Sequence, residues 1–333
     1  MKRSWTKKLG RAALVAFGVV GGFVALTGAR QNRTFEAPRV DIHASTDPAV
    51  IERGRYLVMG PAHCADCHSS PEQRAVLEQG SEVPLIGGNA FHLPVGTFNV
   101  PNITPDPRNG IGRYKDEDIA RILRYGVRPD GQGVLPFMPF ADLSDEDLRA
   151  VISYLRSRPA VSHDVPAHEL NTAGRVVKAW VLEPKSPSGP VPVSVQPEPT
   201  PAYGKYLAHN VANCVGCHTK FDMRTGKMAG PLMGGGAEHP SADDPKKVFV
   251  TPNLTPDPTW GWITDWSEEM FVARLKVGKV HAGSPMPWHA YKRMSDDDLR
   301  ALYRYFRTLP PVAGGPDPSN REAVIMSAQK SAD

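Results

Sequence analysis

The chain of 333 residues has little cysteine and little net charge, and both shortages exclude classes of protein. Four cysteines are too few for a chain of this length to be stabilised mainly by disulfides. The net charge is only +4, from 39 basic and 35 acidic residues, so the positions of the basic residues decide what the charge means. Apolar residues make up 41% of the chain, which is enough to bury cores and excludes a wholly disordered protein. At about 150 residues per domain, the length predicts two domains.

The excess positive charge lies at the N-terminus. Five basic residues and no acidic residue fall within the first eleven positions: Lys2, Arg3, Lys7, Lys8 and Arg11. The rest of the chain therefore carries a net charge of about −1. We expect no nucleic-acid partner, because such partners bind to surfaces rich in Lys and Arg.

An uncharged apolar run, AALVAFGVVGGFVALTGA, occupies residues 12–29. As a helix at about 1.5 Å per residue it would span about 27 Å, close to the hydrocarbon thickness of a bilayer. We interpret it as a single transmembrane anchor in the inner membrane, with a cytoplasmic leader at 1–11, an extended tether at 30–48 and the remainder in the periplasm. A signal peptide cleaved after Thr-Gly-Ala at 27–29 is the alternative, and it would leave a soluble periplasmic protein. A buried core helix is disfavoured because the run has no polar face.

The two halves of the chain repeat one another. Three motifs occur in both halves in the same order: CADCH at 64–68 and CVGCH at 214–218, PNITPDP at 101–107 and PNLTPDP at 252–258, and LSDEDLRA at 143–150 and MSDDDLRA at 294–301. Such self-similarity predicts two homologous domains, which we place at 49–160 and 201–313.

The remaining segments are predicted to be connections. The segment 161–200 contains apolar residues at helical spacing from 170 to 182. Seven of the eighteen residues from 184 to 201 are proline, which predicts an extended, semi-rigid linker. Residues 314–333 form a C-terminal tail.

Local signals within each repeat are helical. Ser144 and Ser295 are favourable N-caps, and each is followed three residues later by an aspartate. Pro159 and Pro310 end the helices that these caps begin. No alternating run of polar and apolar residues indicates strands, so we predict an all-α fold with long loops.

Two glycines and two tyrosines recur in the first helix of each repeat. Gly54 and Gly204 are expected to let the first helix cross closely over the last helix of the same domain. Tyr56 and Tyr206 are expected to fill the volume that remains at this crossing.

The repeated Cys-x-x-Cys-His motif is the attachment signature of c-type haem. Its two thiols form thioether bonds to the haem vinyl groups, and the adjacent histidine reaches the iron as the proximal ligand. On a helical turn the first cysteine and the histidine face the same way. A zinc site or a redox dithiol is disfavoured, because neither half has spare cysteines or a βαβ context. We therefore predict two covalently bound haem c groups, held by Cys64, Cys67 and His68 and by Cys214, Cys217 and His218.

The sixth iron ligand separates an electron carrier from an enzyme. Met138 and Met286 lie 70 and 68 residues after the proximal histidines, and each precedes a proline that stiffens its loop. We predict both as iron ligands, since a thioether favours the reduced iron and suits electron transfer. Packing as a flexible core side chain is the alternative. Met233 is a weaker candidate, because Ile86 stands at its repeat position.

For two further sets of residues the sequence leaves two possible roles open. Asn102 and Asn253, in the proline-rich loops, either bind a haem propionate or cap a turn. Four tryptophans cluster in the second repeat and either wall its haem or form a docking surface: Trp260, Trp262, Trp266 and Trp288.

With these motifs the chain resembles a di-haem protein of the class I cytochrome c superfamily, over residues 50–160 and 200–312. It is most similar to the cytochrome c subunits of bacterial membrane-bound alcohol, gluconate and molybdenum-hydroxylase dehydrogenases. The resemblance implies two tandem class I cytochrome c domains that accept electrons from a dehydrogenase. It also implies a quinone, another cytochrome or a terminal oxidase as the acceptor. Many such subunits carry three haems, whereas this sequence has two attachment motifs.

The leading hypothesis is therefore an electron-transfer protein, or a subunit of a dehydrogenase complex, with no catalytic residues of its own. A di-haem redox enzyme of the peroxidase or thiosulfate dehydrogenase type is the alternative. Such an enzyme needs one exchangeable haem ligand, and the matched pair of methionines argues against it. A structural tether whose haems only stabilise folding is a third, weaker hypothesis.

Overall fold

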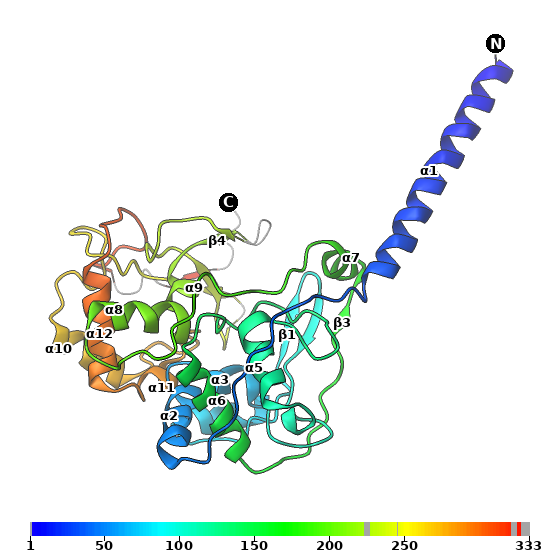
Figure 1. The fold of residues 1–333 in the computed structure, drawn as a ribbon. Coiled ribbons are helices and arrows are strands. Elements are labelled where there is room, and N and C mark those ends of the chain that lie inside the picture. Colours follow the sequence, from blue (N-terminus) through cyan, green and yellow to red (C-terminus); the bar gives the residue numbers. More distant parts are fainter. Residues whose placement is uncertain (1, 223–226, 245, 321–324, 328–333) are drawn as a thin grey trace.

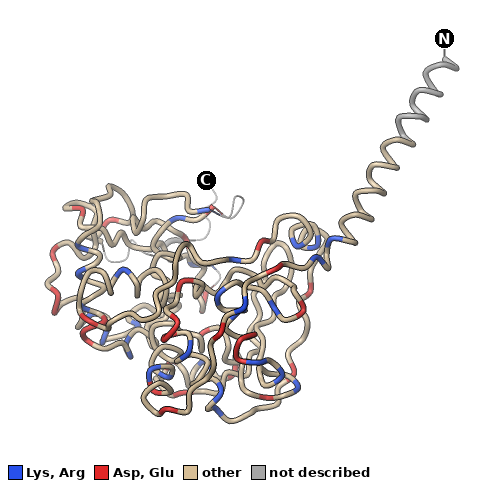
Figure 2. The backbone as a smooth tube through the Cα atoms, viewed as in Figure 1, with Lys and Arg blue, Asp and Glu red and all other residues tan. Residues whose placement is uncertain are grey.

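The computed structural model describes residues 2–222, 227–244, 246–320 and 325–327, with side chains described between residues 14 and 320. Two mainly helical domains lie against each other, and a long N-terminal helix, α1 (Lys2–Arg30), projects away from them (Figure 1). Acidic and basic residues are interspersed over both domains, as Figure 2 shows for the described residues.

The first domain is built on two crossed helices, α2 (Pro48–Met59) and α6 (Asp145–Ser157). Both begin at side-chain caps, because Asp47 accepts a hydrogen bond from the amide of Ala49 and Ser144 accepts one from the amide of Asp147. The shorter helices between them are α3 (Cys64–His68), a turn at Pro71–Gln73, α4 (Arg74–Glu78), a turn at Ile111–Arg113 and α5 (Asp116–Tyr125).

The second domain repeats this plan with α8 (Pro201–Tyr206) and α12 (Asp296–Arg307). A π-helical turn at Leu207–Val211 extends α8, and Ser295 caps α12 by accepting from the amide of Asp298. The shorter helices are α9 (Cys214–His218), α10 (Glu268–Val277) and α11 (Trp288–Tyr291). Buried side chains of both domains form one continuous apolar core, from Leu57 and Ile152 to Leu207 and Leu302.

Glycine makes the two helix crossings possible, as the sequence predicts. A Cβ atom on Gly54 would lie 1.9 Å from the carbonyl oxygen of Ala150 in α6. A Cβ atom on Gly204 would lie 1.9 Å from the carbonyl oxygen of Ala301 in α12. Any larger residue at these positions would force the helices apart, so this expectation is confirmed.

The hydroxyls of the two repeated tyrosines reach across to the other domain, and the filling of the helix crossings by their rings stays a prediction. The Tyr56 hydroxyl donates to Oδ2 of Asp298 at 2.6 Å, and the Tyr206 hydroxyl donates to Oδ2 of Asp147 at 2.7 Å. Because the four residues are two repeated pairs, the contact has approximate two-fold symmetry. We call these four residues the tyrosine clasp. Arg53 donates to both oxygens of Asp147 at 2.8 and 3.1 Å, whereas Asp298 accepts a side-chain hydrogen bond from Tyr203 and feels the charge of Arg53 from farther away.

The all-α prediction is wrong because the loops contain three small antiparallel sheets. In the first domain β1 (Ala90–Leu93) pairs with β2 (Gly96–Asn99), with Phe91 opposite Phe98, and β3 (Glu169–Leu170) joins β2. The strands of the second domain are β4 (Phe221–Asp222), β5 (Lys227–Met228), β6 (Glu238–Pro240), β7 (Lys247–Val250) and β8 (Ile325–Ser327). Strands of two to four residues are too short for alternation to be visible in the sequence.

The predicted N-terminal transmembrane helix is also contradicted. No helix in the part of the chain that the structure describes is long and apolar enough to cross a membrane. The basic leader at 1–11 lies outside the residues whose side chains are described.

The linker contains a helix, α7 (Thr172–Trp180), that packs on the end of α1. The Trp180 ring stacks on Phe23 with centroids 5.9 Å apart, and its N–H donates to the hydroxyl of Thr27 at 3.0 Å. The guanidinium of Arg30 lies 4.5 Å from the centre of the same ring. The linker is thus fixed to both α1 and the sheet of the first domain.

Candidate haem sites

Each CxxCH motif forms one helical turn, α3 in the first domain and α9 in the second. Both turns follow a residue in the left-handed conformation, His63 with φ 39° and Asn213 with φ 51°. This backbone turns the chain sharply, so that the cysteines and the histidine of each motif project from a single short helix. None of the chain's four cysteines is in a disulfide.

The proximal histidines are oriented by proline carbonyls. Nδ1 of His68 lies 2.9 Å from the carbonyl oxygen of Pro101, and Nδ1 of His218 lies 3.0 Å from that of Pro252. Since a carbonyl oxygen only accepts, Nδ1 carries the proton and Nε2 keeps its lone pair. Burial lowers the pKa of His68, and it lowers the pKa of His218 to about 4, so both imidazoles are neutral near pH 7. A neutral imidazole with a free Nε2 is the form that binds iron.

This role of the two prolines was not predicted from the sequence. The recurrence of the Pro-Asn motif 33 and 34 residues after the histidines was the signal that could have indicated it.

Asn102 and Asn253 cap turns, one of the two roles that the sequence left open; a contact with a haem propionate stays a prediction. Oδ1 of Asn102 accepts from the amide and the hydroxyl of Thr104, both at 2.8 Å, and its amide group donates to the carbonyl of Val161 at 2.8 Å. Asn253 makes the equivalent bonds to Thr255 and Val312. Each asparagine therefore fixes the loop whose preceding proline orients the histidine.

The cysteine thiols are held in their protonated form. Burial is the main cause that raises the pKa of Cys64 and of Cys214 to about 12, and it raises the pKa of Cys67 to about 11. A redox dithiol needs a thiolate with a lowered pKa, so the structure disfavours that alternative.

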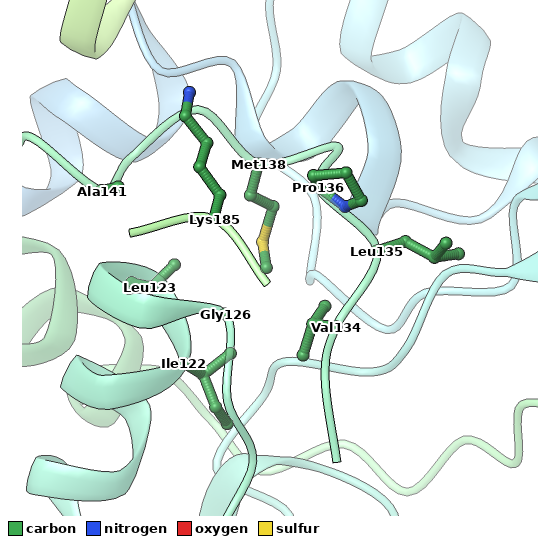
Figure 3. Close-up of a pocket in the computed structure, with 9 residues that line it drawn as sticks. All are labelled: Ile122, Leu123, Gly126, Val134, Leu135, Pro136, Met138, Ala141 and Lys185. Atoms are coloured by element: carbon green, nitrogen blue, oxygen red, sulfur yellow. The ribbon is translucent and has the colours of Figure 1, made fainter. Parts of the chain in front are cut away.

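Met138 lies in an apolar pocket of the first domain. The pocket is lined by Ile122, Leu123, Gly126, Val134, Leu135, Pro136, Met138, Ala141 and Lys185. Figure 3 shows the sulfur of Met138 pointing into this space, toward Leu123 and Val134. The methionine is half-buried and packs against the core.

Met286 is half-buried in a tightly turned loop. The amide of Trp288 donates to the carbonyl of Met286 at 2.8 Å, and the indole N–H of Trp288 donates to the hydroxyl of Ser284 at 3.0 Å. Met233, the weaker candidate, is fully buried in the core. The pairing of His68 with Met138 and of His218 with Met286 stays a prediction.

The four tryptophans of the second domain are packed within it. Trp262 donates to the carbonyl of Pro316 at 2.8 Å, and Trp288 lies 4.0 Å from the guanidinium of Arg274. Trp266 packs against the core. Trp260 is half-buried, and its amide donates to Asp257 at 2.7 Å. These contacts favour a structural role over an exposed docking surface.

The residues present fit a covalently bound haem. The first domain offers two protonated thiols, a neutral imidazole with a free Nε2 and a thioether in an apolar pocket. The second domain repeats the thiols, the imidazole and a half-buried thioether.

Comparison with known proteins gives the family of this arrangement. The cytochrome c family profile matches residues 51–159. The chain is 32% identical to the alcohol dehydrogenase (quinone) cytochrome c subunit of Gluconobacter oxydans over 291 residues, which are 81% of this chain and 56% of that protein. It is 29% identical to the gluconate 2-dehydrogenase cytochrome c subunit of Pantoea cypripedii over 283 residues, 78% of this chain and 60% of that protein.

A shorter relative matches along most of its own length. The chain is 26% identical to a diheme cytochrome c-type protein of Cereibacter sphaeroides over 261 residues, 75% of this chain and 82% of that protein. The chain spans less than two thirds of the alcohol and gluconate dehydrogenase subunits.

These similarities bear out the resemblance drawn from the motifs, and they support the prediction of an electron-transfer protein, because the relatives are named as cytochrome subunits. A cytochrome c domain carries haem c, attached to a CxxCH motif. Residues 51–159 match the cytochrome c family, and the chain is similar to the cytochrome c subunits of bacterial dehydrogenases.

Proposed function

We propose that this chain is a di-haem electron-transfer subunit that takes single electrons from a dehydrogenase and passes them to a respiratory acceptor. The observation that carries the proposal is the duplicated histidine geometry, in which His68 and His218 each bond a proline carbonyl through Nδ1 and leave Nε2 free. A single functional site would not need this arrangement twice.

Each domain supplies one set of haem-binding residues in this proposal. Cys64 and Cys67 would hold the first haem through thioether bonds, and His68 and Met138 would bind its iron. Cys214, Cys217, His218 and Met286 would do the same for the second haem. When bound, each haem supplies an iron that changes its charge by one electron.

The protein's own residues keep this change reversible. Buried histidines with fixed tautomers give the iron the same nitrogen ligand in both states. The apolar wall around Met138 excludes water from the thioether side. A filled sixth position leaves no place for a substrate, so the chain transfers electrons and does not itself oxidise a substrate.

The donor and the acceptor follow from the relatives. The similar proteins are named as cytochrome subunits of alcohol and gluconate dehydrogenases, which makes a dehydrogenase the proposed donor. The acceptor is a quinone, a second cytochrome or a terminal oxidase. We place the haem domains in the periplasm, because a basic segment followed by an uncharged apolar run is typical of an export signal.

Optical spectroscopy of two methionine variants tests the ligand assignment. The oxidised protein is expected to show a Met-to-iron charge-transfer band that falls by half in Met138→Ala and by half in Met286→Ala. Met233→Leu is the matched control, because Met233 is buried in the core of the second domain, and it should leave the band unchanged. A band unchanged in Met138→Ala, or fast binding of carbon monoxide to the reduced native protein, would favour the di-haem enzyme instead.

A further inference from the structure

The two repeats differ in length just after the predicted methionine ligands. Four residues separate Met138 from Leu143, whereas seven separate Met286 from its equivalent, Met294. The longer loop folds into the short helix α11 and carries His289, Tyr291 and Arg293.

This longer loop faces the haem-attachment helix of the first domain. The Tyr291 ring meets the ring of His63 edge-on, with centroids 5.8 Å apart and planes at 81°. Nε2 of His289 lies 3.4 Å from Oδ2 of Asp66, and both side chains are largely buried. His63 directly precedes Cys64, and Asp66 lies between the two cysteines of the first motif.

Charged contacts hold the same face of the two domains together. Nζ of Lys279 lies 2.7 Å from Oε1 of Glu78, and Nη1 of Arg293 lies 4.0 Å from Oε1 of Glu82. Arg293 also donates to the carbonyl of Gly80. Basic side chains of the second domain thus meet carboxylates of the first domain at this interface.

Tyr291 also bonds the segment that leads into the second attachment helix. Its hydroxyl donates to the carbonyl of Ala212 at 2.6 Å, within the buried interior, and Ala212 lies two residues before Cys214. Burial raises the pKa of Tyr291 well above its ordinary value, and the neighbouring Cys214, Cys217 and Asp66 add to this rise. One side chain therefore contacts the residue before the first CxxCH motif and the chain just before the second.

We propose that Tyr291 is a positioning residue: it fixes the segments that lead into the two haem-attachment helices against each other, so that the rate of electron exchange between the two bound haems would depend on it. This inference rests on the proposed function, because it requires two haems in the chain. In the transfer one iron is oxidised and the other reduced by a single electron, and no bond or proton is exchanged. Tyr291 keeps its own electrons and its proton.

The tyrosine clasp cannot take this role in place of Tyr291. Its bonds join α2 to α12 and α8 to α6, so they hold the domains together through the crossed helices. Tyr291 instead contacts the segments that carry the cysteines.

Two variants and one control separate this role from a general loss of stability. Tyr291→Phe removes the hydroxyl bond to Ala212 and keeps the ring against His63, whereas Tyr291→Leu removes both contacts. The control is Tyr303→Phe, because the Tyr303 hydroxyl also donates to a carbonyl in the second domain, that of Trp266 at 2.5 Å. Each haem-loaded protein is given less than one electron per chain by photoreduction, and the rate of electron exchange between the two haems is measured. The two midpoint potentials, the charge-transfer band and the thermal unfolding midpoint are recorded on the same samples.

The expected order of exchange rates is wild type, then Tyr291→Phe, then Tyr291→Leu. Tyr291→Leu should be the slowest, because it loses both the ring contact with His63 and the hydroxyl bond to Ala212. Tyr303→Phe should exchange at the wild-type rate. Wild-type exchange rates in both Tyr291 variants would overturn the inference, and if Tyr291→Leu does not fold, the Phe variant alone decides. A wild-type chain with only one haem would instead refute the proposed function.

Discussion

The tyrosine clasp gives the sharpest test of how the two domains are joined. Tyr56→Phe removes the hydroxyl that donates to Asp298 at 2.6 Å, and Asp298 is only 3% exposed. A hydrogen bond to a buried charge contributes about 1.5–3 kcal/mol, so we expect the free energy of unfolding to fall by about 2–3 kcal/mol.

The equivalent change in the second domain, Tyr206→Phe, should lower the free energy of unfolding by less. Tyr206→Phe removes a bond of nearly the same length, 2.7 Å, to Asp147. Asp147 keeps both of its bonds to the charged Arg53, whereas Asp298 keeps a hydrogen bond from Tyr203, the uncharged residue at the position equivalent to Arg53. Since the carboxylate that remains is still paired, we expect a loss of about 1–1.5 kcal/mol.

Urea unfolding of the haem-loaded protein, followed by far-UV circular dichroism, measures both losses. The double variant Tyr56→Phe/Asp298→Asn supplies the control. In the Asp298→Asn background, Tyr56→Phe leaves no buried charge without a partner. It should therefore lower the free energy of unfolding by about 1 kcal/mol less than it does in the wild-type background. An equal or larger loss in Tyr206→Phe than in Tyr56→Phe would refute the role assigned to Arg53.

Three further predictions follow from buried groups of the two domains. Gly54→Ala should cost about 3 kcal/mol in urea unfolding, because its Cβ would lie 1.9 Å from the carbonyl oxygen of Ala150. Asn102→Ala should lower the free energy of unfolding by about 2–3 kcal/mol, and it should shift the midpoint potential of the first haem only, because it frees the loop that orients His68. Unchanged potentials would contradict this. Burial raises the pKa of Asp298 in the folded protein above its ordinary 3.8, so its contribution to stability is complete below pH 3.8 and is lost as the pH rises through the folded pKa. The unfolding free energy of wild type relative to Asp298→Asn should therefore fall between pH 4 and pH 7, and a difference that rises or stays constant would contradict this sign.

Residues that recur in both repeats were the most predictable part of the fold. Gly54 and Gly204 stand at matched positions before the same apolar pattern, so a close helix crossing could be inferred from either half. The caps at Ser144 and Ser295 were equally visible, because a cap depends on residues only three positions away.

Contacts between the domains were not predictable in the same way. Tyr56 and Asp298 are separated by 242 residues, and nothing local to either residue indicates its partner. The sequence analysis therefore assigned both tyrosines to packing within their own domains. The strands were missed because they are short and because their pairing depends on loops held by the surrounding helices.

The candidate haem sites were predictable as a set of residue types, and less so as a geometry. The CxxCH spacing indicates which atoms bind a haem. It does not indicate that the carbonyls of Pro101 and Pro252 fix the histidine tautomers, since that bond spans more than thirty residues of loop. The apolar surroundings of Met138 likewise come from α5, the following loop and the linker together.

The number of haems on each chain is the most direct test of the whole account. Mass spectrometry of the purified chain under denaturing conditions keeps covalently attached haem and loses any other ligand. We predict a mass increase of two haems per chain, which falls to one haem when Cys64 and Cys67 are both replaced by Ala. A chain that carries one haem or none, or a mass that the double replacement leaves unchanged, would contradict the di-haem account.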